Sequence, residues 1–232
     1  MDLIWDGLRE SFRILGTGDR DVWEIALRSL LISGSATALA LAIGVLVGAT
    51  LAFRRFPGRN LAVALVNTGM GLPPVVVGLV VAILLWRSGP LGQLNLIYTP
   101  AAMVIAQTAI AAPLVTAFTV AALGSLPPRL RPQLYALGAS RWQMLWLVLQ
   151  EARLPLLAAV MAGFGAAVSE VGASLMVGGN LSGETRVLTT AILQEVQRGN
   201  FAPAIALSLI LLVLIFLVNL VLTSVQLRER PS

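Results

Sequence analysis

Residues 124–155 read G-S-L-P-P-R-L-R-P-Q-L-Y-A-L-G-A-S-R-W-Q-M-L-W-L-V-L-Q-E-A-R-L-P, a basic break between long apolar runs that keeps helical character of its own. Pro127 and Pro128 end any preceding helix, because proline donates no backbone hydrogen bond and disfavours helical geometry in the residue before it. Gly138 breaks the short helix that follows, and Ser140 can cap the next one. We call this stretch the bracket. A short helix, a glycine turn and a second helix that leads into a membrane span suit docking onto another protein.

The second helix of the bracket carries large apolar residues at helical spacing. They stand at positions i, i+3, i+4 and i+7: Trp142, Leu145, Trp146 and Leu149. This spacing predicts a single apolar stripe along the helix.

The chain is too apolar for an ordinary soluble domain. Of its 232 residues, 57% are hydrophobic and 12% are charged, and the mean hydropathy is +0.87. The apolar runs are far longer than barrel strands and lack their alternation. The predicted fold class is therefore an all-α integral membrane protein.

Cysteine, histidine and lysine are absent, so all 16 basic residues are arginine. These absences remove a thiol nucleophile, a thiolate metal site, the commonest general base and the G-K-[ST] phosphate loop. No aspartate lies beyond Asp21 to form an intramembrane pair. The composition disfavours an enzyme and predicts no metal or cofactor in this chain. The isoelectric point of about 11.2 is no sign of nucleic-acid binding, because the arginines lie in short loops between apolar runs.

Five apolar runs each exceed the roughly 20 residues that cross a bilayer core: residues 25–53, 61–86, 101–123, 154–177 and 204–225. They predict about five transmembrane helices in one domain, residues 25–228. Arginines concentrate after the first and third runs and in the C-terminal tail. The positive-inside rule then places the N-terminus outside and the C-terminus, with the bracket, in the cytoplasm.

Residues 1–24 contain six of the 11 acidic residues. Ile4, Leu8, Phe12 and Leu15 share one helical face, with charged residues opposite. This pattern predicts an amphipathic helix at the membrane interface. The alternative is a frayed polar tail.

Prolines interrupt two of the apolar runs. Pro73 and Pro74 lie in the second run and Pro113 in the third, where each is expected to kink or break the helix. Broken helices are tolerated at membrane depth where they line a cavity or are buried in protein. The alternative is that each kink is harmless.

The fourth run combines small residues with an acid. Ala159, Gly163 and Ala167 form a small-xxx-small ridge that allows close helix approach, and we expect a second copy to pack on it. Glu170 lies well inside the run with no opposite charge beside it, which marks it as a functional candidate in the translocation pathway. The alternative is a structural hydrogen bond to a neighbouring helix, with the acid protonated.

Polar groups gather just after this run. They are Gly178, Gly179, Asn180, Thr185, Arg186, Thr189 and Thr190. Free backbone N–H groups and side-chain donors of this kind suit an oxyanion. The alternative is a polar external loop that merely re-enters the bundle.

The bracket resembles the cytoplasmic coupling loop of ABC-importer permeases, whose motif is E-A-A, three residues, glycine, and later a hydrophobic-x-Leu-Pro. Gly138 matches the glycine, and Leu154 and Pro155 match the closing pair. P-Q-L at 132–134 replaces the triplet, and Pro155 falls about one helical turn late. The resemblance implies contact with an ATPase subunit through Arg129, Arg131, Tyr135, Ala136, Gly138, Ala139, Ser140, Arg141 and Trp142.

Residues 163–180, G-F-G-A-A-V-S-E-V-G-A-S-L-M-V-G-G-N, resemble molybdate, tungstate and sulfate permeases. T-R-V-L-T-T-A-I at 185–192 and G-L-P-P-V-V-V-G-L at 71–79 are most similar to tungstate permeases, and the resemblance spans residues 29–222. It implies a type I ABC importer in the inner membrane of a prokaryote. Two copies would form the path, with Pro73 and Pro74 among its candidate residues. Separate ATPase subunits would bind ATP and Mg, and an extracytoplasmic binding protein would deliver the anion.

Two alternatives stay open. Within the importer class, the substrate is molybdate or sulfate, since the binding protein is expected to select the anion. In another class, the protein is a stand-alone channel or passive scaffold, which would not need the bracket and would keep its conductance without residues 128–142.

Overall fold

The structure is a computed structural model that describes residues 5, 7, 9, 13 and 20–228. Ile4, Leu8, Phe12 and Leu15, which carry the prediction of an amphipathic N-terminal helix, lie outside the described residues. The regular elements of the described residues are all helices, and these residues contain no strand. This confirms the predicted fold class.

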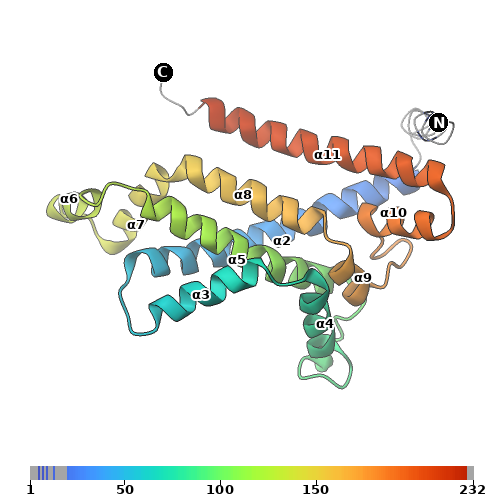
Figure 1. Ribbon diagram of the computed structural model, residues 1–232, viewed down its shortest axis with the longest axis horizontal. Helices are drawn as coiled ribbons and strands as arrows, with labels where there is room; N and C mark the ends of the chain where they lie inside the picture. The colour runs from blue at the N-terminus through green and yellow to red at the C-terminus, as the bar shows by residue number, and fades with distance from the viewer. Residues whose placement is uncertain (1–4, 6, 8, 10–12, 14–19, 229–232) are drawn as a thin grey trace.

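Four helices lie side by side along the long axis of the molecule (Figure 1): α2 (Arg20–Phe53), α5 (Pro100–Gly124), α8 (Arg153–Val168) and α11 (Phe201–Arg228). The shorter elements are α3 (Arg59–Met70), α4 (Pro74–Leu85), η1 (Gly92–Leu94), α6 (Leu130–Ala136), α7 (Arg141–Glu151), α9 (Gly172–Gly178) and α10 (Leu188–Gln197). The α2–α3 turn, helices α6 and α7 and the end of α11 lie toward the same side of the molecule, which we call the bracket end. The start of α2 and helix α10 lie at the opposite end, the outer-loop end (Figure 1).

Among the described residues, α2, α5 and α11 are each long and apolar enough to cross a membrane. The number rises to five if the bent pairs α3–α4 and α7–α8 each count as one span. The first, third and fifth predicted spans therefore each correspond to one helix. The second and fourth do not.

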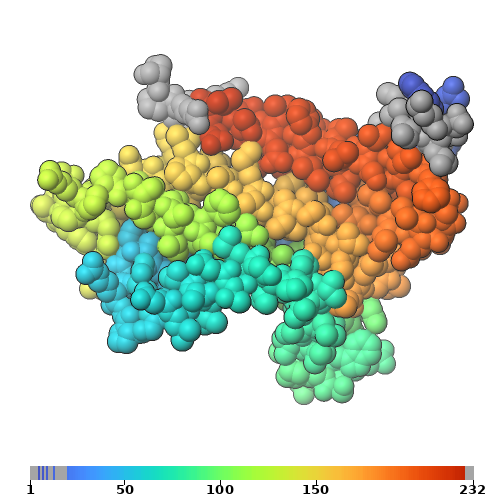
Figure 2. Space-filling model, viewed as in Figure 1, coloured from blue at the N-terminus to red at the C-terminus, as the bar shows by residue number. Residues whose placement is uncertain are grey.

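The second run is broken at its prolines. Helices α3 and α4 meet at 103°, with Pro73 as the N-cap residue of α4 and Pro74 in its first turn, which confirms the predicted break. Each helix has 12 residues and is about 18 Å long, too short to cross the bilayer alone. Helix α4 and the loop after it project from the body of the molecule (Figures 1 and 2).

Of the two outcomes expected at Pro113, a kink or a break, the break does not occur, because α5 continues through this residue. A proline inside a helix removes one backbone hydrogen bond and introduces a bulky ring. Here the ring packs against α3 at Gly69, where an added Cβ would lie 2.9 Å from the Cβ of Pro113.

Small residues join α2, α5 and α8 closely. Gly44 and Gly48 of α2 form a G-x-x-x-G pair, and an added Cβ at either would lie 2.7 Å from a side-chain atom of Val115 or Thr119 on α5. On α8, Gly163 faces the same Val115 at 2.9 Å. The α8 ridge is thus used inside one chain, and the expectation that it needs a second copy is wrong.

Candidate functional site

The bracket folds as two short helices around a glycine turn. Gly138 has φ +83°, a left-handed conformation that suits glycine because it has no Cβ. Ser140 then caps α7: its Oγ accepts a hydrogen bond from the Gln143 amide at 3.3 Å, and the Gln143 Oε1 accepts one from the Ser140 amide at 2.8 Å. This reciprocal cap confirms the predicted helix start.

Helix α7 presents two different apolar faces. Met144 and Val148 are buried against α2 and α5, in a cluster that includes Ala49 and Leu123. Trp142 and Trp146 lie on another face and are 78% and 64% exposed. The predicted stripe lies along one continuous helix, but its residues differ in exposure. Leu145 and Leu149 pack on the buried cluster, whereas the tryptophans are exposed.

The outward face of the bracket is large and apolar. Leu137 is 84% exposed, and Tyr135 is exposed beside it. An open groove of about 470 Å³ lies between α6 and α7, lined by Leu134, Leu137, Gly138, Ala139, Gln143, Trp146 and Leu147. The other predicted contact residues, Arg129, Ala136, Ser140 and Arg141, are exposed. Such a surface fits an apolar partner side chain.

Arg131 differs from the other predicted contact residues. Its guanidinium lies 4.3 Å from the centre of the Phe53 ring, and its Nη1 donates to the Phe53 carbonyl at 3.5 Å. The side chain therefore attaches α6 to the end of α2. The Arg131 side chain therefore holds the bracket against α2 and does not extend toward a partner protein.

Glu170 lies at the break between α8 and α9 and is 6% exposed. Its Oε1 accepts a hydrogen bond from the Ala173 amide at 2.7 Å, and its carbonyl accepts one from Thr189 Oγ1 at 3.2 Å. The carboxylate thus caps the first turn of α9. The break also meets the bend at Pro73 and Pro74, since an added Cβ at Gly172 would lie 2.9 Å from Val75 Cγ2.

All three threonines named as oxyanion donors are engaged by the backbone, and Thr189 donates to the Glu170 carbonyl. Thr185 Oγ1 donates to the Gly178 carbonyl at 2.5 Å and accepts from the Leu181 amide at 2.9 Å. Thr190 Oγ1 donates to the Val187 carbonyl at 3.0 Å and accepts from the Val187 amide at 3.1 Å. All three threonines are buried. They shape the loop and leave no hydroxyl hydrogen for an anion.

Other polar atoms of this loop have no partner among the described residues. Asn180 Oδ1 and Arg186 Nε are buried and make no hydrogen bond there. Asn180 also has φ +54°, while Gly179 has φ +69° and lies against the Tyr98 ring. Arg186 Nε is therefore a donor of this group without a hydrogen-bond partner among the described residues.

The structure adds a residue that the sequence analysis did not select. Arg28 of α2 donates to the Gly183 carbonyl at 2.8 Å and to the Arg186 carbonyl at 3.1 Å. These bonds join the loop before α10 to α2. A charge inside the first apolar run was the signal, because intramembrane arginines are rare and have partners.

Helix α4 packs closely on α9 at Gly78. An added Cβ at Gly78 would lie 2.5 Å from the Ala173 Cα. Because Ala173 also receives the Glu170 cap, the two broken runs form one packed unit. The structure therefore brings Pro73, Pro74, Glu170 and Thr189 together, and leaves Asn180 and Arg186 in the loop that follows α9.

Residues 40–231 match the family described as "Binding-protein-dependent transport system inner membrane component". A "Probable anion ABC transporter permease protein" of Haloferax volcanii is 43% identical over 82% of this chain and 84% of its own length. The "Tungstate uptake system permease protein TupB" of Peptoclostridium acidaminophilum is 38% identical over 97% of this chain and 99% of its own. The "Molybdenum transport system permease protein ModB" of Haemophilus influenzae is 25% identical over 84% and 89%.

Solved structures with the same fold include an inward-facing MetNI methionine ABC transporter. Its matching chain has a TM-score of 0.68 at 20% identity, over 91% of this chain and 95% of that one. At this level of identity the comparison shows the fold alone. The fold is that of a type I ABC importer permease.

Proposed function

Because the chain belongs to the family of binding-protein-dependent transport system inner membrane components, we propose that it is the membrane subunit of an ATP-driven tungstate importer. Permeases of this family work with an ATPase and a substrate-binding protein, and a separate ATPase subunit hydrolyses the ATP. Tungstate is proposed as the anion because the chain is 38% identical to a tungstate permease over nearly the whole length of both chains. Molybdate is the second candidate, supported by the weaker match to a molybdenum permease.

The bracket is the proposed contact with the ATPase. Its exposed Leu137 and Trp142 are costly to leave in water, and the groove between α6 and α7 offers a partner side chain a place to bind. Arg131 and the buried face of α7 fix this surface to α2 and α5. A movement of the docked ATPase would therefore move the helices as rigid bodies. This coupling converts ATP-driven closure outside the membrane into alternating access within it.

The pathway is proposed to run beside the joined breaks of α4 and α9, with Arg186 as the first anion contact. Glu170 would act there as a positioning residue, since a carboxylate repels an oxyanion and this one caps α9. An extracytoplasmic binding protein would deliver tungstate at the outer-loop end, where α10 lies. ATP and Mg belong to the partner ATPase in this proposal.

Two copies of the chain are proposed to form the importer. Support comes from α4, which projects from the bundle and exposes Val75, Val76, Leu79, Val80 and Ile83. A short apolar projection of this kind would be covered by a second copy. The proposed orientation places the bracket end and the C-terminus in the cytoplasm, which agrees with the arginines of the α2–α3 turn.

Metal accumulation in cells with and without this chain tests the proposal. At nanomolar supply of both anions, we expect deletion to abolish tungsten uptake and to leave molybdenum uptake nearly unchanged. Equal loss of tungsten and molybdenum uptake would still support an oxyanion importer but would contradict the choice of tungstate as its specific substrate. Unchanged uptake of both would support the channel alternative or another anion.

A further inference from the structure

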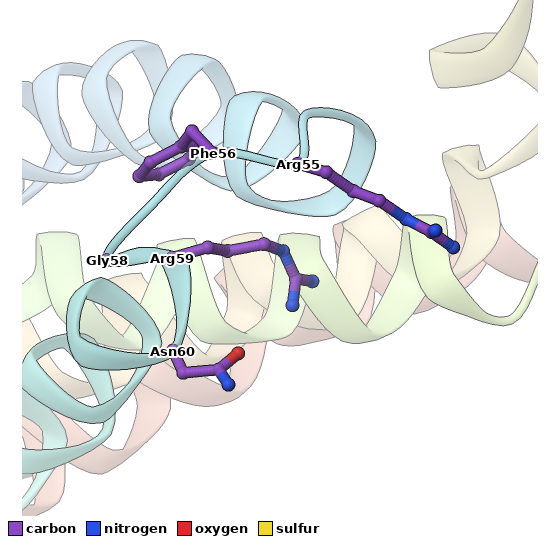
Figure 3. Close-up of a pocket in the computed structure, with 5 residues that line it drawn as sticks. All are labelled: Arg55, Phe56, Gly58, Arg59 and Asn60. Atoms are coloured by element: carbon purple, nitrogen blue, oxygen red, sulfur yellow. The ribbon is translucent and has the colours of Figure 1, made fainter.

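The turn between α2 and α3 forms an open pocket of about 350 Å³ at the bracket end. Its lining consists of Arg55, Phe56, Gly58, Arg59 and Asn60. In Figure 3 the two arginine side chains extend from the turn in the same direction, away from Phe56. The pocket is small, polar on one side and separate from the groove of the bracket.

This pocket carries uncompensated positive charge. The sequence contains no acidic residue between Glu24 and Glu151, and within the described part of the chain neither Arg55 nor Arg59 makes an ion pair. The Arg59 Nε donates to the Leu51 carbonyl at 2.7 Å, which fixes its guanidinium at the end of α2. A guanidinium held in this way is suited to a phosphate group.

An exposed apolar surface adjoins the basic pocket. Phe56 is exposed at the turn, and Leu61 and Leu65 are exposed one turn apart along α3. A ligand that matches both surfaces has an anionic head and an apolar tail. Free phosphate would use only the arginines, and an acidic protein segment would leave the leucines uncovered.

We propose that this pocket binds the phosphate headgroup of an anionic phospholipid, with its acyl chains along α3. Basic pockets beside transmembrane helices bind anionic lipid headgroups on the cytoplasmic side. The lipid would fix the α2–α3 turn at the membrane surface, beside the bracket. The proposal requires this turn to lie at a bilayer surface and is independent of the anion transported.

Lipid titration of the purified permease–ATPase complex, followed by native mass spectrometry, tests the proposal. The probes are phosphatidylglycerol, phosphatidylcholine and inorganic phosphate. Each arginine near an anionic lipid surface contributes about fivefold in affinity, so Arg55→Gln with Arg59→Gln should weaken phosphatidylglycerol binding about twenty-five-fold. Arg55→Gln alone, which keeps the Arg59 bond to α2, should weaken it about fivefold.

A control pair with the same loss of charge is Arg87→Gln with Arg198→Gln, at exposed positions outside the pocket. The control should bind phosphatidylglycerol like the parent, and no variant should change phosphatidylcholine binding. Equal weakening in the control would overturn the proposal, since it would show a general charge effect. Displacement of the lipid by inorganic phosphate at equal concentration would also overturn it. Unchanged lipid affinity with release of the ATPase would assign the pocket to the ATPase instead.

Discussion

The cap that Glu170 provides can be separated from any transport role of its charge. Glu170→Ala removes the acceptor and leaves the Ala173 amide, now bonded at 2.7 Å, without a partner in a buried position. A buried, orphaned N–H and a lost cap each cost about 1–2 kcal/mol, so we expect the free energy of unfolding to fall by about 2 kcal/mol. Glu170→Gln keeps an acceptor oxygen, and its loss should be about 1 kcal/mol or less.

Thermal unfolding in phospholipid nanodiscs measures this difference. For a chain of this length, 2 kcal/mol corresponds to a Tm about 4–8 °C lower. Glu184→Ala is the control, because this acid is exposed in the loop before α10. Its effect on the free energy of unfolding should stay within about 0.5 kcal/mol.

Tungsten uptake by the same variants completes the test. We expect Glu170→Gln to assemble with the ATPase and to transport near the parent rate, because the cap is kept. A glutamine variant that unfolds like the parent yet transports nothing would refute the positioning role and show that the charge is needed. An alanine variant with an unchanged Tm would refute the cap itself.

Three further outcomes are expected. Gly138→Asp should abolish co-purification of the ATPase and preserve membrane insertion. The control is Gly183→Asp, which has a similar φ of +79° and equally open surroundings and should retain the ATPase. Loss of the ATPase in both variants would point to backbone strain alone. Gly78→Ala should lower the free energy of unfolding by about 1–3 kcal/mol, because its Cβ would meet α9 backbone. Gly34→Ala on α2, with no atom within 4 Å of an added Cβ, should be neutral or stabilising, and a neutral Gly78→Ala would contradict the close α4–α9 contact. A reporter fused after Ser232 should register as cytoplasmic, and an external signal would reverse the proposed orientation.

The local features that the sequence predicted correctly depend on few neighbouring residues. Pro73 and Pro74 break the second run because proline acts on its own backbone and on the residue before it. Gly138 adopts a left-handed turn, and Ser140 caps the helix that follows. The membrane class followed from composition alone. These outcomes need no knowledge of what lies across the chain.

The features that the sequence did not predict depend on packing between distant segments. Pro113 stays within α5 because its ring lies against Gly69 of another helix. The α8 ridge is covered inside one chain because Val115 is already placed there by α5. Trp142 is exposed because Met144 and Val148 occupy the buried face of α7. In each case the pattern was present in the sequence, but the packing of distant segments set which residues contact it.

The candidate site divides in the same way. Residue types and spacing determined which groups can serve a transporter: an acid inside an apolar run, a glycine turn between basic helices, and polar groups after the fourth run. The bonds of Glu170, Thr185 and Thr190 join groups no more than seven residues apart. Only the tertiary structure decided that Thr189 bonds the Glu170 carbonyl and that Arg28 holds the outer loop. The reason is physical: hydrogen bonds across 19 or 155 residues are set by how helices pack, and no local pattern encodes that distance.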